Sequence, residues 1–198
     1  VFISHFHAEQ KEKSDFQLSE LQSIFYEALE GTLKGVFAND ALNRLIFKGR
    51  ISAGDLELLR AYIAYLQQVN FQLSSSIIID VLCRHYLITK LILKLFHLKF
   101  TPGKRKIRQQ SKCRNQLTQK LAEVSNVYDD RLLSALINLV DATVRTNFYY
   151  QDKEALVLKI STRKLSFVPQ PKPLFDAFIY SQKCEGIYLR MSRVARGG

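Results

Sequence analysis

Residues 52–66 read SAGDLELLRAYIAYL, and this stretch decides the fold class because its apolar residues recur at helical spacing. The residues that share one face of the predicted helix are Leu56, Leu59, Ile63 and Leu66. Ser52, followed three residues later by Asp55, resembles a capping box in which Asp replaces Glu. The stretch therefore predicts a strong helix that begins at Ser52.

Helical spacing continues on both sides of this stretch and accounts for most of the chain. Further helices are predicted over residues 18–33, 39–49 with Asn39 as N-cap, 74–82 with an N-cap among the serines 74–76, 85–100, 104–127 as a polar segment, and 129–144 with Asp129 or Asp130 as N-cap. Long regular elements should therefore dominate the first three quarters of the molecule.

After Tyr150 the apolar pattern becomes extended instead of helical. Three prolines between residues 169 and 173 break the chain into a linker. The predicted short strands are residues 1–7, 155–160, 177–180 and 187–189. The expected fold class is α+β, mainly α-helical, with a short N-terminal strand and a C-terminal β-rich segment.

Composition indicates a globular protein without a membrane span. The chain has 198 residues, of which 47% are hydrophobic and 24% charged, and this length allows a real hydrophobic core. Its most apolar stretch, residues 87–100, is interrupted by Lys90, Lys94 and Lys99 at helical spacing, which predicts a solvated face. Three widely spaced cysteines and the lack of a signal-peptide pattern predict a reducing, cytoplasmic setting.

The basic run over residues 104–114 is the best candidate for nucleic-acid binding in a chain of net charge +11. No aromatic residue is interleaved to stack on bases, so a solvated helix face or a contact with an acidic neighbour is the competing interpretation. His5 and His7 would share one strand face, but no third metal ligand is indicated, and we expect no metal site. No G-x-G-x-x-G, Walker, G-x-S-x-G or H-E-x-x-H motif is present, so we expect that this chain does not hold a dinucleotide pyrophosphate in the usual way.

Arg196, Gly197 and Gly198 form the most informative local motif. A guanidinium can bind a carboxylate through two parallel hydrogen bonds, and glycines let the backbone approach a ligand closely. The motif predicts a carboxylate-binding site, with a flexible turn as the alternative interpretation.

Several stretches, in the same order along the chain, resemble the large bacterial NAD-specific glutamate dehydrogenases. Residues 185–190, EGIYLR, and 195–198, ARGG, are similar to that family's E-G-(V/I)-H-L-R and A-R-G-G-L-R-W-S-D. Residues 145–151, RTNFYYQ, resemble R-T-N-(Y/F)-(F/Y)-Q, and residues 59–66 carry L-R-A-Y-x-x-Y-L. Further matches lie at residues 43–45, 95–100, 171–173 and 178–181.

The resemblance implies that the chain is an internal part of a very large enzyme. Residues 1–13 would complete an upstream ACT-type domain and its linker, residues 14–150 would form a helical domain, and residues 151–198 would open the dehydrogenase catalytic domain. The parent enzyme would oxidise L-glutamate to 2-oxoglutarate and ammonia with NAD as hydride acceptor, as a homo-oligomer of full-length chains.

The resemblance also assigns roles at the C-terminal motif. Arg196, Gly197 and Gly198 would bind the substrate, while the catalytic lysine and the nucleotide-binding domain would follow Gly198. The chain alone would then be inactive and would bind no cofactor. A stand-alone basic helical module that binds nucleic acid or a protein partner is the alternative function.

Two positions depart from the family pattern. Tyr188 stands where the family favours His, and residues 191–193 stand where a Gly-Gly pair is expected after the arginine. Side chains in a glycine loop obstruct close backbone approach. We therefore expect this member either to differ at its substrate site or to be impaired in catalysis.

Overall fold

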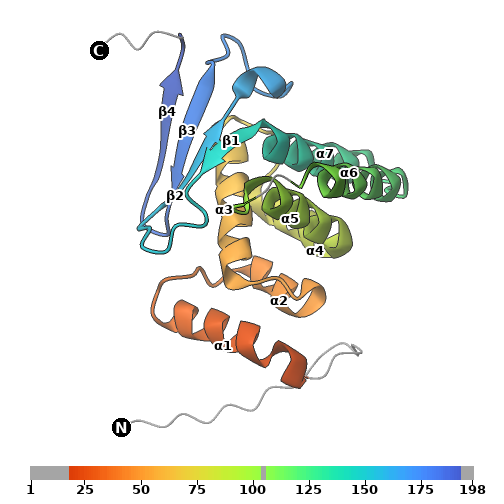
Figure 1. Ribbon diagram of the computed structural model, residues 1–198, viewed down its shortest axis with the longest axis vertical. Coiled ribbons are helices and arrows are strands. Elements are labelled where there is room, and N and C mark those ends of the chain that lie inside the picture. The colour runs from red at the N-terminus through yellow and green to blue at the C-terminus, as the bar shows by residue number, and fades with distance from the viewer. Residues whose placement is uncertain (1–17, 104–105, 193–198) are drawn as a thin grey trace.

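The computed structural model describes residues 18–103 and 106–192, which form a group of helices and an antiparallel sheet (Figure 1). The helices are α1 (Leu18–Leu33), α2 (Arg44–Gly49), α3 (Ala53–Gln68), α4 (Ser75–Arg84), α5 (Tyr86–Phe100), α6 (Ile107–Ala122) and α7 (Val127–Ala142). The strands are β1 (Thr143–Thr146), β2 (Leu156–Ile160), β3 (Phe175–Tyr180) and β4 (Glu185–Arg190), with short 3-10 turns η1 (Ala41–Asn43) and η2 (Thr162–Lys164). The predicted fold class, mainly α-helical α+β with a C-terminal β-rich segment, is confirmed; the strand predicted over residues 1–7 lies outside the described residues.

Helix α3 lies between the sheet and the other helices (Figure 1). Its predicted apolar face is buried, and so are residues on its other faces, including Tyr62 and Tyr65, which are 1% and 0% exposed. One cluster of buried residues runs from α1 through α3 and α7 to strands β2 and β3. Because side chains on several faces of α3 are buried, this helix joins the helical part to the sheet in one core.

The predicted N-caps are confirmed at two helices and wrong at two others. The Ser52 side chain accepts a hydrogen bond from the Asp55 backbone N–H and donates to the Asp55 carboxylate at 2.9 Å. Ser74 caps α4. Asp40, one residue after the predicted Asn39, caps the segment that leads into α2. Asp and Asn are equally good caps, so the residue types did not distinguish the two.

Helix α7 is capped by Asn126, not by Asp129 or Asp130 as predicted. The Asn126 Oδ1 accepts from the backbone N–H groups of Tyr128 at 2.9 Å and Asp129 at 3.2 Å. Asp129 lies in the first turn, is 4% exposed, and its carboxylate accepts from Arg84 at 2.7 Å. The helix therefore begins earlier because an amide supplies the cap and the carboxylate is used in packing.

Helix α7 ends at Ala142, and the predicted helical position Val144 lies in strand β1. Thr143 pairs with Ile160 of β2, and a bulge follows between Thr143 and Arg145. The β-branched residues at this junction fit a pleated strand well. The correction arises because strand β2, which forms the pairing partner, lies more than ten positions away in the sequence.

Lys99 of α5 fixes the C-terminal end of α7. Its Nζ donates to the backbone carbonyls of Val140, Asp141 and Thr143 at 2.9, 2.8 and 2.6 Å. Burial lowers the pKa of Lys99 to about 8, so the ammonium form still predominates at neutral pH. A cation at a helix C-terminus satisfies the last carbonyl groups and interacts favourably with the helix dipole.

The four strands form an antiparallel sheet in the order β1-β2-β3-β4. One face packs against α3, where the Tyr65 and Phe178 rings meet edge to face at 5.5 Å. The buried side chains of this inner face include Leu156, Leu158, Ile160 and Phe178. Strands β2, β3 and β4 confirm the three predicted strands near the C-terminus.

The structure describes the three cysteines and the helices that the sequence analysis compared with a membrane span. Cys83 and Cys113 are buried, Cys184 is exposed, and all three are free thiols. Among the described residues, no helix combines the length and the apolar character needed to cross a membrane. The domain boundary near residue 150 stays a prediction.

Candidate functional site

Strand β4 leads the chain toward the predicted substrate-binding residues. Arg196, Gly197 and Gly198 lie outside the described residues, six positions and more after the end of β4 at Arg190. The end of β4 is held in place because the Leu174 backbone N–H donates to the Arg190 carbonyl at 2.7 Å. The structure therefore fixes the strand from which the motif departs.

Two cationic side chains flank this end of the sheet. Arg190 is paired with Phe175 across β3 and β4. On β2, the Lys159 Nζ lies 4.7 Å from the centre of the Phe175 ring. Clustered positive charge raises the local concentration of anions, so this end of the sheet attracts anionic groups.

A buried tyrosine–aspartate pair joins α3 to β3. The Tyr65 hydroxyl donates to Asp176 Oδ2 at 2.8 Å, and Asp176 is 1% exposed. Its other oxygen, Oδ1, has no hydrogen-bond partner among the described residues. Burial raises the pKa of the Asp176 carboxyl, and the hydrogen bond from Tyr65 opposes part of that rise.

The sequence analysis did not identify Asp176, although a signal was present. Asp176 and Phe178 are two positions apart in a strand, so they share one face. Once Phe178 is assigned to the core, the carboxylate must be buried beside it. A buried carboxyl needs a donor, and only the tertiary structure shows that Tyr65 supplies one.

The other inward tyrosine of α3, Tyr62, contacts β1 at one edge of the sheet. Thr143 Oγ1 donates to the Leu139 carbonyl at 2.7 Å, so the Tyr62 hydroxyl is the donor in its 2.9 Å contact with Thr143. Tyr62 and Tyr65 thus attach α3 to β1 and β3 respectively. The two tyrosines of the stretch at residues 59–66 therefore hold the sheet against α3.

Arg60 connects α3 to the loop before α2. It is 5% exposed and forms a two-point ion pair with Asp40, with N–O distances of 2.9 and 2.8 Å. The guanidinium also donates to Glu57 Oε1 at 2.6 Å and to Asn43 Oδ1 at 2.7 Å. Glu57 in turn accepts from Gln182 in the β3–β4 turn at 2.8 Å, so the network reaches the sheet.

A second polar network surrounds His97. Its Nε2 lies 2.7 Å from Asp55 Oδ1, and its Nδ1 lies 2.6 Å from the Tyr149 hydroxyl. The Tyr149 hydroxyl also contacts Thr101 Oγ1 at 2.8 Å. The His97 ring is partly buried, and its contacts attach the R-T-N-F-Y-Y-Q stretch to helices α3 and α5.

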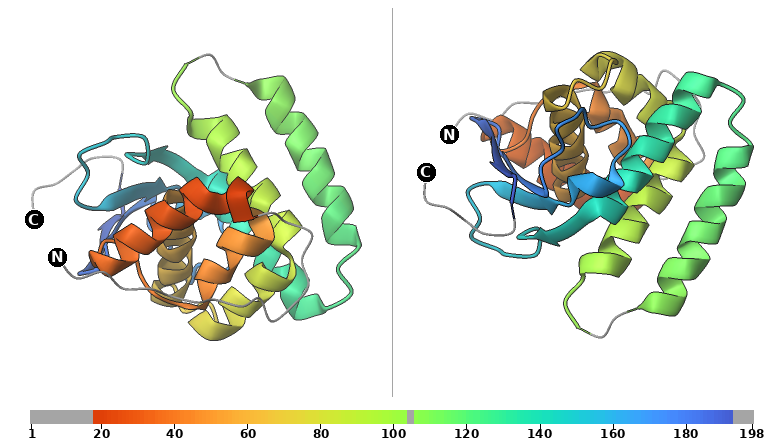
Figure 2. Two further views of the ribbon diagram at one scale, coloured as in Figure 1. Left: turned by 90° about the horizontal axis from the view of Figure 1, so that it is seen from below. Right: turned by 90° about the horizontal axis from the view of Figure 1, so that it is seen from above.

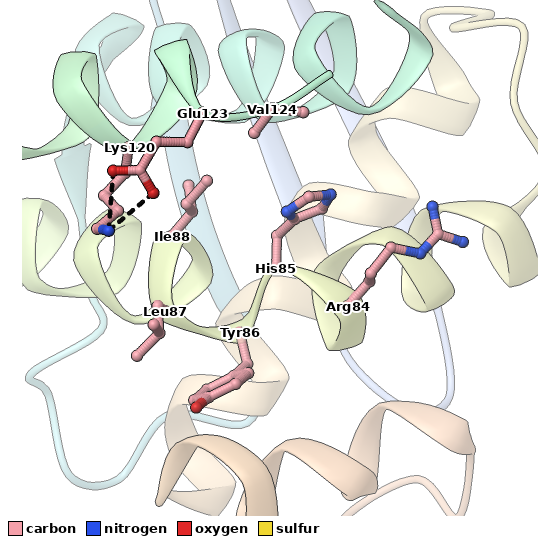
Figure 3. A pocket seen from close by; sticks show the side chains of 8 residues that line it. All are labelled: Arg84, His85, Tyr86, Leu87, Ile88, Lys120, Glu123 and Val124. Atoms are coloured by element: carbon pink, nitrogen blue, oxygen red, sulfur yellow. Dashed lines mark hydrogen bonds and ion pairs between the residues drawn. The ribbon is translucent and has the colours of Figure 1, made fainter. Parts of the chain in front are cut away.

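A small pocket of about 180 Å³ lies beside the junction of α4 and α5 (Figure 3). Figure 3 shows Lys120 joined to Glu123 at its rim. Two other polar side chains of its lining, Arg84 and His85, both contact the buried Asp129 carboxylate. Ligand pockets usually measure about 300–1,000 Å³, so this hollow is too small, and its charges too well paired, for a substrate site.

The predicted basic run lies mainly on α6, which runs beside α5 (Figure 2). Arg108 and Lys112 are exposed, but Arg114 forms an ion pair with Asp141 of α7. Lys104 and Arg105 lie outside the described residues. Within the described part of the chain, no group of three or more His, Cys, Asp or Glu side chains is placed to hold a metal ion.

Two family models match this chain. Residues 37–102 match the model described as glutamate dehydrogenase, helical motif 3, which covers η1 to α5. Residues 116–198 match the model described as bacterial NAD-glutamate dehydrogenase, catalytic domain. The second match begins within α6 and includes α7 and the whole sheet.

Curated relatives give the same assignment. The chain is 34% identical over its full length to an NAD-specific glutamate dehydrogenase of Halomonas elongata, and 31% identical over 93% of its length to one of Pseudomonas aeruginosa. A Mycobacterium tuberculosis protein of the same name is 31% identical over 88% of the chain. The matched segment makes up 13%, 12% and 11% of these three proteins. The chain belongs to the family of large NAD-specific glutamate dehydrogenases.

Proposed function

We propose that this chain is part of an NAD-dependent enzyme that oxidises L-glutamate to 2-oxoglutarate and ammonia. The match over the whole chain to an NAD-specific glutamate dehydrogenase is the observation that carries the proposal. In such an enzyme NAD⁺ accepts the hydride, and the protein binds and orients the substrate. The catalytic lysine and the nucleotide-binding domain would lie in parts of the parent polypeptide outside this chain.

The division of labour within the chain follows the same proposal. Residues 1–13 would complete an upstream domain, residues 14–150 would form the helical part, and residues 151–198 would open the catalytic domain. The catalytic-domain model matches from residue 116 onward, so the last part of α6 and all of α7 accompany the sheet in that match. The buried contacts of Tyr62 and Tyr65 support a role for the helical part in holding the sheet.

Arg196 would bind a carboxylate of glutamate, and Gly197 and Gly198 would let the backbone approach it. The proposal is supported by the position of the motif shortly after β4 and by the cations Lys159 and Arg190 at that end of the sheet. A guanidinium is suited to a carboxylate because it donates two parallel hydrogen bonds.

The test is Arg196→Ala in the full-length enzyme. Charge-assisted hydrogen bonds contribute about 1.5–3 kcal/mol, which corresponds to a rise of roughly 10- to 150-fold in the Michaelis constant for glutamate. The Michaelis constant for NAD⁺ should change little. Lys183→Ala, which removes a cation from the exposed β3–β4 turn, is the matched control and should leave both constants unchanged. An Arg196→Ala enzyme with normal kinetics would exclude Arg196 as the substrate contact.

A further inference from the structure

The outer face of the sheet is turned away from α3 and is not covered by any described element (Figures 1 and 2). Strand register defines this face, because directly paired residues point to the same side of a sheet. Val157 pairs with Ile179, and Lys159 pairs with Ala177, which pairs with Tyr188. These rows alternate with the row of Phe178, which is buried against α3.

The residue types on this outer face resemble those of a buried surface. β2 reads Leu-Val-Leu-Lys-Ile and β3 reads Phe-Asp-Ala-Phe-Ile-Tyr, so apolar residues occupy both faces. Antiparallel strands with one wet face normally alternate between apolar and polar residues, whereas strands covered on both sides are nearly continuous apolar runs. Ile179 and Tyr188 are nevertheless 38% and 65% exposed. The sequence of the sheet therefore indicates a cover that the described residues do not supply.

The charges on this face have one sign. Arg145, Lys159 and Arg190 lie on it, as the register of β1, β2 and β4 shows. Among the described strand residues, the two carboxylates, Asp176 and Glu185, fall in the rows of the opposite face. Complementary surfaces place opposite charges across from each other. A cover for this face should therefore carry carboxylates.

The dimensions of the face suit one helix. From Phe175 to Ile179 the apolar strip of β3 extends about 14 Å, and from β2 to β4 it spans about 10 Å. A helix is about 10–12 Å wide and rises about 1.5 Å per residue, so nine or ten residues, roughly, would cover the strip. Small residues, Ala177 and Gly186, occupy the middle of the apolar strip. A Cβ placed on Gly186 would meet nothing within 4 Å.

We propose that the outer face of the sheet binds an amphipathic helix whose flanks carry carboxylates, supplied by the parent polypeptide outside residues 1–198. This inference rests on the proposed function only in requiring that longer polypeptide, of which the chain represents 11–13% in its relatives. A second copy of the chain is a poor occupant, because face-to-face pairing would oppose the cations of Arg145, Lys159 and Arg190.

Thiol accessibility tests the proposal directly. Tyr188→Cys and, separately, Ala177→Cys are placed in a Cys184→Ser background, since Cys184 is the exposed native thiol. The rate of reaction with a soluble maleimide is compared between the 198-residue chain and the full-length polypeptide. We expect both thiols to react at least about tenfold more slowly in the full-length polypeptide. Lys112→Cys on the exposed face of α6 is the control and should react alike in both.

Charge reversal identifies the chemistry of the cover. Arg145→Glu combined with Lys159→Glu should restore fast labelling of the Tyr188→Cys thiol in the full-length polypeptide, because both residues would then repel its carboxylates. Equal labelling rates in the two proteins without reversal would overturn the proposal. If the Tyr188→Cys thiol stays protected after the charge reversal, the proposed acidic character of the helix is wrong. Protection within the isolated chain that grows with its concentration would identify a second copy as the occupant and overturn the proposal.

The labelling experiment and the test of the proposed function can fail independently of each other. Glutamate-dependent NAD⁺ reduction together with a reactive Tyr188→Cys thiol would refute the docking surface and leave the enzyme assignment intact. A protected Tyr188→Cys thiol in a folded full-length polypeptide without that activity would support the docking surface and refute the enzyme assignment.

Discussion

Arg60 offers the sharpest test of how the helical part is held together, through the substitution Arg60→Met. Methionine keeps an apolar stem in the space of the arginine side chain but removes the guanidinium. The change leaves Asp40 and Glu57, whose side chains are 33% and 18% exposed, without their shared cation. Removing one partner of a buried ion pair costs about 3–5 kcal/mol. Water reaches Asp40, so we expect the lower end, about 3 kcal/mol.

Urea unfolding of the chain at 25 °C, followed by circular dichroism, measures this loss of free energy of unfolding. Thermal unfolding gives a second measure. For a protein of this size each kcal/mol lowers the melting temperature by about 2–4 °C, so Arg60→Met should melt roughly 6–12 °C below the wild type. Arg44→Met removes a cation from the exposed ion pair with Asp80 and should cost less than about 1 kcal/mol. A loss for Arg60→Met no larger than that of Arg44→Met would refute the reasoning.

Three further predictions concern single polar groups. Asp176→Asn should stabilise the fold at pH 7 relative to the wild type and less so at pH 4. The reason is that the raised pKa of Asp176 makes the native state favour its protonated form, so wild-type stability falls as pH rises through that pKa; a variant less stable at pH 7 would contradict this. Asn126→Ala should lower the free energy of unfolding by about 0.5–2 kcal/mol and Asp130→Ala by less, and the reverse order would refute the Asn126 cap. Lys99→Met should cost about 1–3 kcal/mol because three carbonyls of α7 lose their donor, whereas Lys94→Met, at an exposed position of the same helix, should cost under about 0.5 kcal/mol by the same chemical denaturation.

Local sequence signals predicted most of the fold because they act over a few residues. Ser52 with Asp55, and Ser74 before an apolar run, marked helix starts that the structure confirms. The strands β2 to β4 were visible as short apolar runs between prolines and turns. The signal failed where a tertiary partner decides the outcome. Val144 continues the apolar spacing of α7, yet pairing with β2 makes it part of the β1 segment.

The candidate site was predicted less completely than the fold. Residues 196–198 are predicted to bind the substrate, and this assignment stays a prediction, because a three-residue motif does not show which groups surround it. The cations Lys159 and Arg190 meet at Phe175 only through strand pairing. Asp176 was hidden in an apolar run because its partner, Tyr65, is 111 positions away. Such long-range polar pairs cannot be read from helical or strand periodicity.

We propose that this chain is part of an active glutamate dehydrogenase, and NADH formation by the full-length polypeptide is the most direct test. We expect NAD⁺ reduction that requires L-glutamate and yields one 2-oxoglutarate for each NADH. A folded full-length polypeptide that forms no NADH from L-glutamate would exclude this function.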